Sequence, residues 1–265
     1  MSKSKFGFLL GADPELFLQK NGEKKILSAI GKIGGTKKAP KPAEGLAKGY
    51  AYQEDNVLVE YNIPPAADVR EFTYANNTMM TYLNKMVGEK YDCHLVVKAS
   101  HVMDDDQLQE PEAHVFGCDP DFNVWTMEDN PPPFNENPNL RSAGGHLHVG
   151  AKMTRMEKFL LGRLLDASVG LWSVIKDSDK RRRGLYGKAG AIREKPYGME
   201  YRTLSNFWLK GDDYQRKVYD YVLQSWMRLG RKDFAFIDKH GDDIIAAINN
   251  SDKPLAAKLL EWQGL

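Results

Sequence analysis

The residues best suited to chemistry in this sequence are acids, histidines and an arginine that lie in four short motifs. The first motif is Gly11-Ala-Asp13-Pro-Glu15-Leu-Phe-Leu18. Asp13 and Glu15 are two positions apart, so on a β-strand both carboxylates lie on the same face. Like charges placed there repel each other, and a bound cation relieves that repulsion. A solvated strand face or an Asp-Pro turn is the alternative interpretation.

The second motif, Tyr52-Gln-Glu54-Asp-Asn-Val-Leu-Val-Glu60-Tyr-Asn62, contributes two more acids. Glu60 lies in its most strand-like part. Glu54 is six residues earlier, an even spacing that places it on the face of Glu60 if the strand continues. The neighbouring valines and leucine indicate burial, and a buried carboxylate needs a partner. An exposed, bland strand face is the alternative.

The third motif is Arg141-Ser-Ala-Gly-Gly-His146-Leu-His148-Val-Gly150. His146 and His148 share one face of the expected strand, and the glycine pair allows a backbone or a ligand to come close. A lone histidine is usually structural. Two histidines spaced in this way beside glycines favour a metal-ligand or phosphate site.

The fourth motif is Gly198-Met-Glu200-Tyr-Arg202-Thr-Leu-Ser-Asn206. Glu200 and Arg202 again share a face, and a local ion pair is the plainer interpretation. Together the motifs provide five carboxylates and two histidines, a donor set that suits Mg²⁺ or Mn²⁺ rather than a structural zinc. Because one Mg²⁺ rarely takes five carboxylates from a protein, we expect two or more metal ions and phosphate chemistry.

A basic segment precedes the fourth motif. Seven of the sixteen residues from Lys180 to Lys195 are basic, and glycines lie between them. We expect Lys188 and Arg193 to bind phosphate, whereas 181–183 is typical of a solvated charge run at a helix C-terminus. The lysine-rich segment 31–49 is interpreted as a solvated linker rather than a lid. Asp119-Pro-Asp121 repeats the first motif's pattern but is typical of a turn, so the predicted site excludes it.

The elements that must position these residues are strands in the first half of the chain and helices in the second. Hydrophobic periodicity predicts a helix that starts near Asp68, and a capping box at Thr154 and Glu157 opens another that continues to Ile175. This order indicates an α+β fold built on an antiparallel sheet. We expect one domain over 1–265, with a core of about 1–210 and a helical tail of about 211–265. Strands are predicted at 6–19, 56–62, 94–101 and 200–209, helices at 69–90, 155–175, 212–236, 242–249 and 252–262, and a loop at 130–139.

Composition limits the classes of protein that fit. The chain has 265 residues, with 37 Lys+Arg against 36 Asp+Glu. This balance argues against blanket binding to nucleic acid or to an anionic membrane. The two cysteines form no disulfide framework, and no signal peptide or membrane span is predicted, so we expect a cytoplasmic protein. Walker A, Rossmann, zincin and α/β-hydrolase motifs are absent from the sequence.

The four motifs, taken in order, resemble those of carboxylate–amine ligases related to glutamine synthetase and glutamate–cysteine ligase. The closer resemblance is to the phage-type COOH–NH2 ligase (amidoligase) family. Asp13-Pro-Glu15-Leu-Phe-Leu is similar to the ExEFFL strand of glutamine synthetase, with Asp for the first Glu. Gly144-Gly-His146-Leu-His148 is similar to its GxxHxH strand, and Glu200-Tyr-Arg202 to its ExR strand. Glu54 and Glu60 correspond to its pair of mid-chain metal glutamates.

The resemblance implies a glutamine-synthetase-like, funnel-shaped half barrel with helices on its outer face. It implies ATP as co-substrate, two or more Mg²⁺ or Mn²⁺ ions, and an amide or peptide-like bond formed through an acyl phosphate, with ADP and phosphate as products. The implied metal ligands are Asp13, Glu15, Glu54, Glu60, His146 and Glu200; the implied ATP-binding and phosphate-binding residues are His148, Lys188, Arg193 and Arg141; and the implied catalytic residues are Arg202, Glu60 and Glu200.

The expected partners are a small-molecule or peptide carboxylate and an amine, with no direct nucleic-acid binding and no membrane. If the protein is phage-encoded, it would act in the host cytoplasm. Two alternatives remain open: a metal-dependent phosphoesterase or nuclease, and a catalytically inactive nucleotide-binding protein on the same scaffold.

Overall fold

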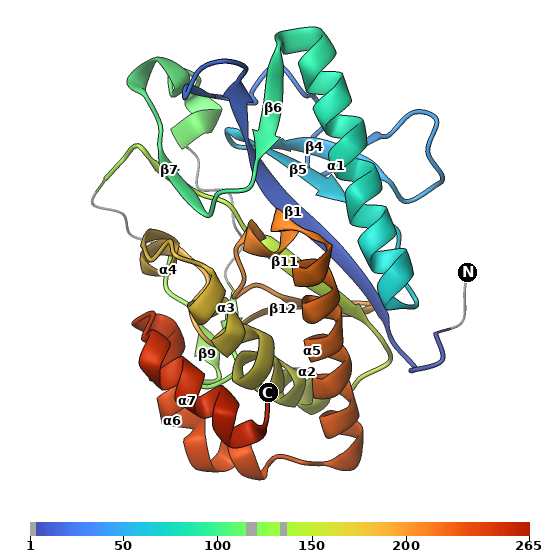
Figure 1. Ribbon diagram of the computed structural model, residues 1–265, viewed down its shortest axis with the longest axis vertical. Coiled ribbons are helices and arrows are strands. Elements are labelled where there is room, and N and C mark those ends of the chain that lie inside the picture. Colours follow the sequence, from blue (N-terminus) through green and yellow to red (C-terminus); the bar gives the residue numbers. More distant parts are fainter. Residues whose placement is uncertain (1–3, 115–120, 133–136) are drawn as a thin grey trace.

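The computed structural model describes residues 4–114, 121–132 and 137–265, and it combines a large sheet with seven α-helices in these ranges (Figure 1). The strands are β1 (Leu9–Lys20), β2 (Ile26–Leu27), β3 (Lys41–Pro42), β4 (Ala51–Asp55), β5 (Leu58–Asn62), β6 (Cys93–Val96), β7 (Ser100–Val102), β8 (Phe122–Asn123), β9 (Glu128–Asp129), β10 (Leu140–Ser142), β11 (Gly145–Gly150), β12 (Ala191–Lys195) and β13 (Gly198–Tyr201). The α-helices are α1 (Val69–Tyr91), α2 (Arg155–Leu165), α3 (Leu171–Lys176), α4 (Arg181–Leu185), α5 (Asp212–Arg231), α6 (Ala235–Asn249) and α7 (Lys253–Gln263).

The sheet is antiparallel at every strand pairing in the described ranges, which confirms the expected α+β class. Its main path runs β3-β4-β5-β1-β11-β13-β12-β8-β9, while β2 and β6 also pair with β1. The end strands β3 and β9 do not pair with each other, so the sheet is open rather than a closed barrel. Strands β7 and β10 form a separate pair.

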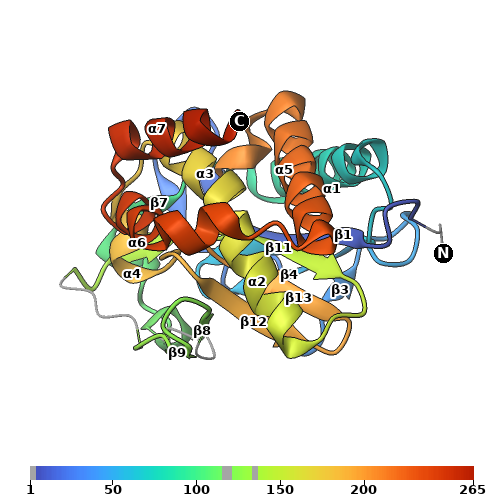
Figure 2. The same cartoon turned by 90° about the horizontal axis from the view of Figure 1, so that it is seen from below.

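The helices gather on one side of the sheet (Figure 2). Strand residues that face them are apolar and buried, as the two-residue period of a strand requires. Leu10, Leu147, Met199 and Ile192 belong to one large hydrophobic cluster with residues of the helices. The motif side chains alternate with these apolar residues, so they lie on the opposite face.

The predicted helix starts at 69 and 155 are confirmed, because their capping residues are visible in the sequence. Two predicted boundaries are wrong: α5 ends at Arg231 rather than 236, where Lys232 takes a left-handed φ of 56°, and α6 starts at Ala235 rather than 242. The Asp68 side chain accepts hydrogen bonds from the backbone N–H groups of Arg70 and Glu71, which starts α1. Thr154 and Glu157 form the expected capping box of α2. Helical structure continues from α2 to α3 through one π-helical turn, Asp166–Gly170.

Three strand predictions need correction. The segment 94–101 holds two strands, β6 and β7, that pair with different partners. The predicted strand 200–209 ends at Tyr201, and a 3₁₀-helix (Asn206–Lys210) follows. In 51–62 the chain turns at Asn56, whose φ of 52° is left-handed, and forms the hairpin β4–β5. Residues 133–136 of the predicted loop 130–139, together with Cys118, lie outside the described residues.

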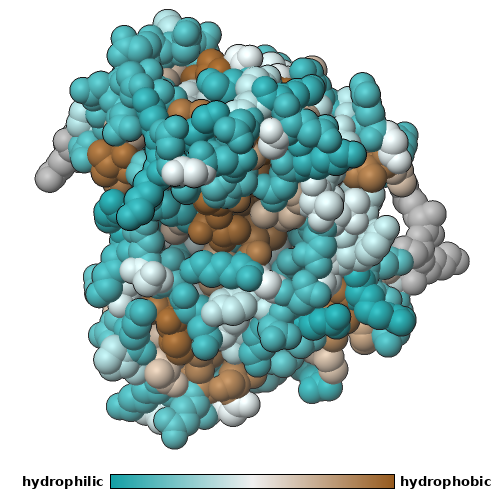
Figure 3. Space-filling model, turned by 45° about the horizontal axis from the view of Figure 1, so that its top comes forward, coloured by the Kyte–Doolittle hydropathy of each residue, from teal (hydrophilic) through white to brown (hydrophobic). Residues whose placement is uncertain are grey.

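The helical tail packs into the same core as the sheet. Tyr219 of α5 lies beside Phe8 with 5.9 Å between ring centroids, and its hydroxyl donates to the Ala67 carbonyl oxygen at 3.1 Å. Val218 and Val222 are fully buried there, and each stabilises the fold by about 2 kcal/mol. Hydrophilic residues dominate the face in Figure 3, and apolar residues occupy smaller areas. Among the described residues, no helix is both long and apolar enough to span a membrane.

Candidate active site

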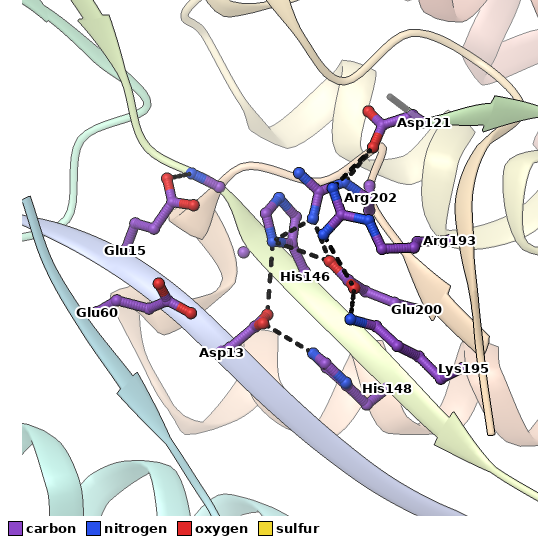
Figure 4. A network of polar contacts seen from close by, with 12 residues as sticks. Asp13, Glu15, Glu60, Asp121, His146, His148, Arg193, Lys195, Glu200 and Arg202 are labelled. Atoms are coloured by element: carbon purple, nitrogen blue, oxygen red, sulfur yellow. Dashed lines mark hydrogen bonds and ion pairs between the residues drawn. The ribbon is translucent and has the colours of Figure 1, made fainter. Parts of the chain in front are cut away.

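Strand register brings most of the predicted site residues onto one face of the sheet. Asp13 of β1 lies opposite His146 of β11, and Glu15 lies opposite Glu60 of β5. In the same way, Glu200 of β13 lies opposite His148 of β11 on one side and opposite Arg193 of β12 on the other. Directly opposed residues of an antiparallel pair project to the same side, so these side chains form one continuous polar surface (Figure 4).

One side of this surface carries acids with few positive partners, and we call it the acidic cluster: Asp13, Glu15, Asp55 and Glu60. Glu60 is 7% exposed, and the side-chain amide of Gln53 donates to it at 2.9 Å. Glu15 is also buried and accepts the backbone N–H of Gly144 at 2.7 Å. Both of these hydrogen bonds therefore come from neutral donors.

The other side carries three cations around one carboxylate, and we call these four residues the basic cluster: Arg193, Lys195, Arg202 and Glu200. All three cations pair with the buried Glu200. The Lys195 ammonium lies 2.9 Å and the Arg193 guanidinium 3.6 Å from its carboxylate, and Arg202 forms a close ion pair with it. Asp121 adds a second carboxylate, 2.5 Å from Nε of Arg202 and 3.7 Å from Arg193.

Asp13 and the two histidines lie where the clusters meet, as Figure 4 shows. Nδ1 of His146 is 3.5 Å from Asp13 and 3.6 Å from Glu200. Nε2 of His148 is 2.9 Å from Asp13, and its Nδ1 contacts the Tyr197 hydroxyl. The imidazole of His146 therefore lies between the Asp13 carboxylate of the acidic cluster and the Glu200 carboxylate of the basic cluster.

The pKa values divide in the same way as the charges except at Asp13, where burial is outweighed by His148 and His146, which hold the pKa well below its ordinary range. Burial raises the pKa of Glu60 well above its ordinary value, and the charges of Asp13, Asp55 and Glu15 add to the effect. Burial and Glu15 raise the pKa of Asp55 to about 6. Burial also disfavours the charged form of Glu200, yet the positive charge of Arg202 outweighs it and brings its pKa to about 2. The acidic cluster is short of positive charge, whereas the basic cluster balances its own.

The centre of the site fits a divalent cation. One ligand atom each from Asp13, His146 and Glu200 lies within 4.8 Å of the others. Oδ1 of Asp13 and Oε2 of Glu200 are buried and accept no hydrogen bond from the described residues, although both carboxylates take part in ion pairs. Carboxylate oxygens with one imidazole are suitable ligands for Mg²⁺ or Mn²⁺.

The glycine pair before β11 allows this approach. A Cβ atom on Gly144 would strike the ring of His146, and one on Gly145 would strike the carbonyl oxygen of Ser205. In both cases the added Cβ atom would come closer than van der Waals contact allows, and the second clash is with backbone, which does not move aside easily. The close approach that the sequence indicated for this pair is therefore confirmed.

Glu54 does not share the face of Glu60, so that expectation is wrong. In the β4–β5 hairpin Gln53 lies opposite Glu60, and Glu54 lies opposite Val59. The Glu54 carboxylate instead accepts the backbone N–H groups of Ile33 and Gly34, at 3.0 and 2.5 Å. It anchors the lysine-rich segment 31–49 to the sheet.

Two other predicted phosphate-binding residues, Arg141 and Lys188, have different surroundings. Arg141 is buried and donates to the carbonyl oxygens of Pro138 and Ala113, both at 2.6 Å. Lys188 is exposed, and its side chain has no ion pair with a described residue. The interpretation of 181–183 as solvated is correct only for Arg181, because Arg182 and Arg183 are 3% and 6% exposed and donate to backbone carbonyl oxygens.

Four residues near the site were missed from the sequence: Asp55, Asp121, Lys195 and Tyr197. The hairpin signal Asp55-Asn56 would have identified Asp55, because an even offset from Gln53 places it on the face of Glu60. Asp121 was set aside as part of a turn, although its similarity to the first motif was visible. Lys195 is two residues from Arg193 on β12 and so shares its face.

A pocket of about 510 Å³ opens next to the site. His148 and Tyr197 line it on the side of the charged residues. Most of its remaining surface is apolar and comes from Leu9, Ala12, Ile63, Pro65 and Ala151. A largely apolar pocket that ends at a charged surface suits a ligand with a flat, uncharged part and a polyanionic part.

Comparison with known proteins finds one family that part of the chain matches. No curated protein matches the chain. Residues 137–223 match the model of the family described as phage phiEco32-like COOH.NH2 ligase-type 2. The matched segment contains His146, His148, Arg193, Glu200 and Arg202, whereas the acidic cluster lies before it. The match covers the third and fourth motifs, and it supports the resemblance of this chain to the phage-type COOH–NH2 ligase (amidoligase) family.

Proposed function

We propose that the protein is an ATP-dependent carboxylate–amine ligase that forms an amide or peptide-like bond and releases ADP and phosphate. The observation that carries the proposal is the position of the acidic cluster directly beside the basic cluster on one sheet face, with Asp13 and His146 between them. Cations and triphosphate oxygens require these two kinds of surface next to each other. The family match supports the same reaction class.

The residues divide into those that would hold metal and those that would bind phosphate. Asp13, His146 and Glu200 would hold one divalent cation, and the acidic residues Glu15 and Glu60 provide ligands for another. When bound, such ions neutralise the charge of the phosphates and of the transferred phosphoryl group. The raised pKa values of Glu60 and Asp55 support this role, since burial and neighbouring carboxylates oppose their charged forms and a bound cation would favour them.

The protein's own cations would act on the phosphate oxygens. Arg202 and Arg193 pair with Glu200, next to the proposed cation site, and from there their guanidinium groups would contact phosphate oxygens. His148 connects this region to the 510 Å³ pocket, which is wide enough for a nucleoside. ATP would therefore lie with its base in the pocket and its phosphates over the strands. As part of the same proposal, the sheet would have a form similar to that of glutamine synthetase.

The reaction has two balanced steps. A substrate carboxylate oxygen attacks the γ-phosphorus, the bond to the β–γ bridging oxygen breaks, and ADP leaves. An amine then attacks the carbonyl carbon of the acyl phosphate, the C–O bond breaks, phosphate leaves and the amine loses a proton. The acyl phosphate is needed because a free carboxylate is a poor electrophile.

The decisive experiment is an ADP-release screen over pairs of carboxylates and amines, with mass spectrometry of the products. We expect ADP and phosphate only when both substrates are present with Mg²⁺ or Mn²⁺. AMP as the nucleotide product would contradict the proposal. Cleavage of a phosphodiester without ATP would indicate a phosphoesterase or nuclease. Tight ATP binding with no turnover across the panel would indicate an inactive nucleotide-binding protein.

A further inference from the structure

A buried carboxylate behind the sheet holds the segments that carry the basic cluster. Asp166 opens the π-helical turn after α2 and is fully buried. It faces the apolar side of the sheet and is not one of the acids that line the site. A buried carboxylate with no cation partner is costly, so each hydrogen bond that it accepts constrains the structure around it.

Four donors from three separate segments meet at this one carboxylate. Oδ1 accepts the Tyr201 hydroxyl at 2.7 Å and lies 3.2 Å from the Thr203 hydroxyl, whose one proton also has the Lys188 carbonyl oxygen as an acceptor at 3.1 Å. Oδ2 accepts the Trp125 indole N–H at 2.7 Å and the backbone N–H of Gly190 at 2.6 Å. Gly170 leaves room for this arrangement, since a Cβ atom there would crowd the Tyr201 hydroxyl.

Each of these segments also carries a residue of the charged network. Tyr201 and Thr203 flank Arg202, Gly190 precedes the strand that bears Arg193, and Trp125 follows Asp121 by four residues. Arg202 follows Tyr201, the last residue of β13. Its backbone N–H donates to the Ala191 carbonyl oxygen at 2.9 Å, so residues 202 and 203 lie just past the end of the strand.

We propose that Asp166 is a positioning residue for Arg193 and Arg202. It joins the end of β13, the start of β12 and the turn after β8 into one unit. Arg182 supports the same unit from the other side, donating to the carbonyl oxygens of Thr203 and Arg202 at 2.9 and 3.3 Å. The proposal rests on the proposed function only in giving these arginines a phosphate-binding role.

Asp166→Asn tests this role with little change in volume. The amide oxygen can keep the Trp125 and Gly190 N–H groups, and the amide nitrogen then faces the Tyr201 and Thr203 hydroxyls, which must turn from donors into acceptors. The substitution also removes the negative charge that all four donors share. The matched control is Ser168→Ala in the same π-helical turn. Ser168 is equally buried and bonds to the Leu164 carbonyl oxygen and to Ser225, outside the segments that carry the arginines.

The first readout needs neither turnover nor nucleotide. The Nε–H group of Arg202 lies 2.5 Å from Asp121 and is buried, so its ¹⁵N–¹H resonance is protected and is assigned by its loss in Arg202→Lys. We expect that resonance to shift or broaden in Asp166→Asn and to stay in place in Ser168→Ala. An unchanged resonance in Asp166→Asn would overturn the proposal.

The second readout separates phosphate binding from metal binding. We expect Asp166→Asn to bind ATP at least tenfold more weakly, while Mn²⁺ alone binds within twofold of wild type by electron paramagnetic resonance. Equal loss of both would show general collapse and would contradict a positioning role. If Asp166→Asn does not fold, Trp125→Phe and Thr203→Val each remove one donor and should give the same shift in smaller measure. Failure of wild type to release ADP with any acid–amine pair would count against the proposed function alone, because the resonance still decides the role of Asp166.

Discussion

The acidic and basic clusters lie on neighbouring strands of one sheet, yet they handle charge in opposite ways. In the basic cluster, Glu200 forms ion pairs with Arg193, Lys195 and Arg202, and its pKa is lowered to about 2. In the acidic cluster, Glu60 has an amide partner, and burial raises its pKa. The comparison shows that the basic cluster balances its own charge, whereas burial and neighbouring carboxylates oppose the charged forms of Glu60 and Asp55 in the acidic cluster. This difference supports the proposal that cations bind on the acidic side.

The largest expected effect comes from breaking the basic cluster. Glu200→Gln removes the carboxylate that Lys195, Arg193 and Arg202 share and leaves these cations without their common partner. We expect ADP release to fall by at least about 10³-fold and the free energy of unfolding to fall by about 3 kcal/mol, measured by urea denaturation.

Glu194→Gln provides the matched control for this change. Glu194 lies on β12, the strand that pairs with the β13 strand of Glu200, but it pairs with Arg155 and Lys158 at the surface, at 2.9 and 3.1 Å. It should change stability by less than about 1 kcal/mol. Activity retained in Glu200→Gln would remove Glu200 from the site.

The acidic cluster should respond with the opposite sign. Glu60→Gln removes a charge that burial and three neighbouring carboxylates oppose, so we expect the metal-free protein to become more stable by about 1 kcal/mol while ADP release is lost. Added Mg²⁺ should raise the unfolding temperature of wild type more than that of the variant. A metal-free variant less stable than wild type would contradict the comparison, and the exposed Glu89→Gln is the control.

The pH dependence of stability gives a third test. The folded pKa of Asp55 is raised to about 6 from 3.8, so the folded state binds more protons than the unfolded state between these values. Its contribution to stability is present below about pH 4 and is lost as the pH rises to about 6. We expect Asp55→Asn to flatten this part of the metal-free curve, measured by urea denaturation at intervals of pH. An unchanged slope would show that burial and the neighbouring acids do not raise the pKa of Asp55 in the folded protein.

The smallest effect should come from Glu54, which lies on the opposite face from Glu60. We expect Glu54→Gln to change Mn²⁺ affinity by less than about twofold, whereas Glu60→Gln should weaken it at least about tenfold. Electron paramagnetic resonance of free Mn²⁺ measures both. Equal losses in the two variants would place Glu54 in the metal site despite the strand register.

Local sequence signals predicted the features that depend on neighbours along the chain. The Asp68 cap, the Thr154 capping box and the two-residue alternation at 13–15, 146–148 and 200–202 each have a local cause, and the structure confirms the elements that they predict. The periodicity also placed the motif side chains of β1, β11 and β13 on a common face.

Features that depend on distant partners were not predictable in the same way. Glu54 was assigned to the wrong face because even spacing has meaning only within one strand, and the chain turns at Asn56. Arg182 has a basic residue's usual preference for solvent, yet carbonyl oxygens of 202 and 203 hold it inside. Asp166 gave no motif at all, since its four donors come from segments 24 to 41 residues away.

Strand β1 has a consequence for how the site forms during folding. It pairs with β11 through 9–14, with β5 through 15–16 and with β6 through 17–20, so the same strand adjoins both clusters. Loss of β1 would dismantle the acidic cluster and remove the neighbour of β11 in one cooperative event. Slow amide hydrogen exchange along this strand would therefore report the fraction of molecules that possess a complete site. A molecule that has only one of the two clusters should not accumulate at equilibrium.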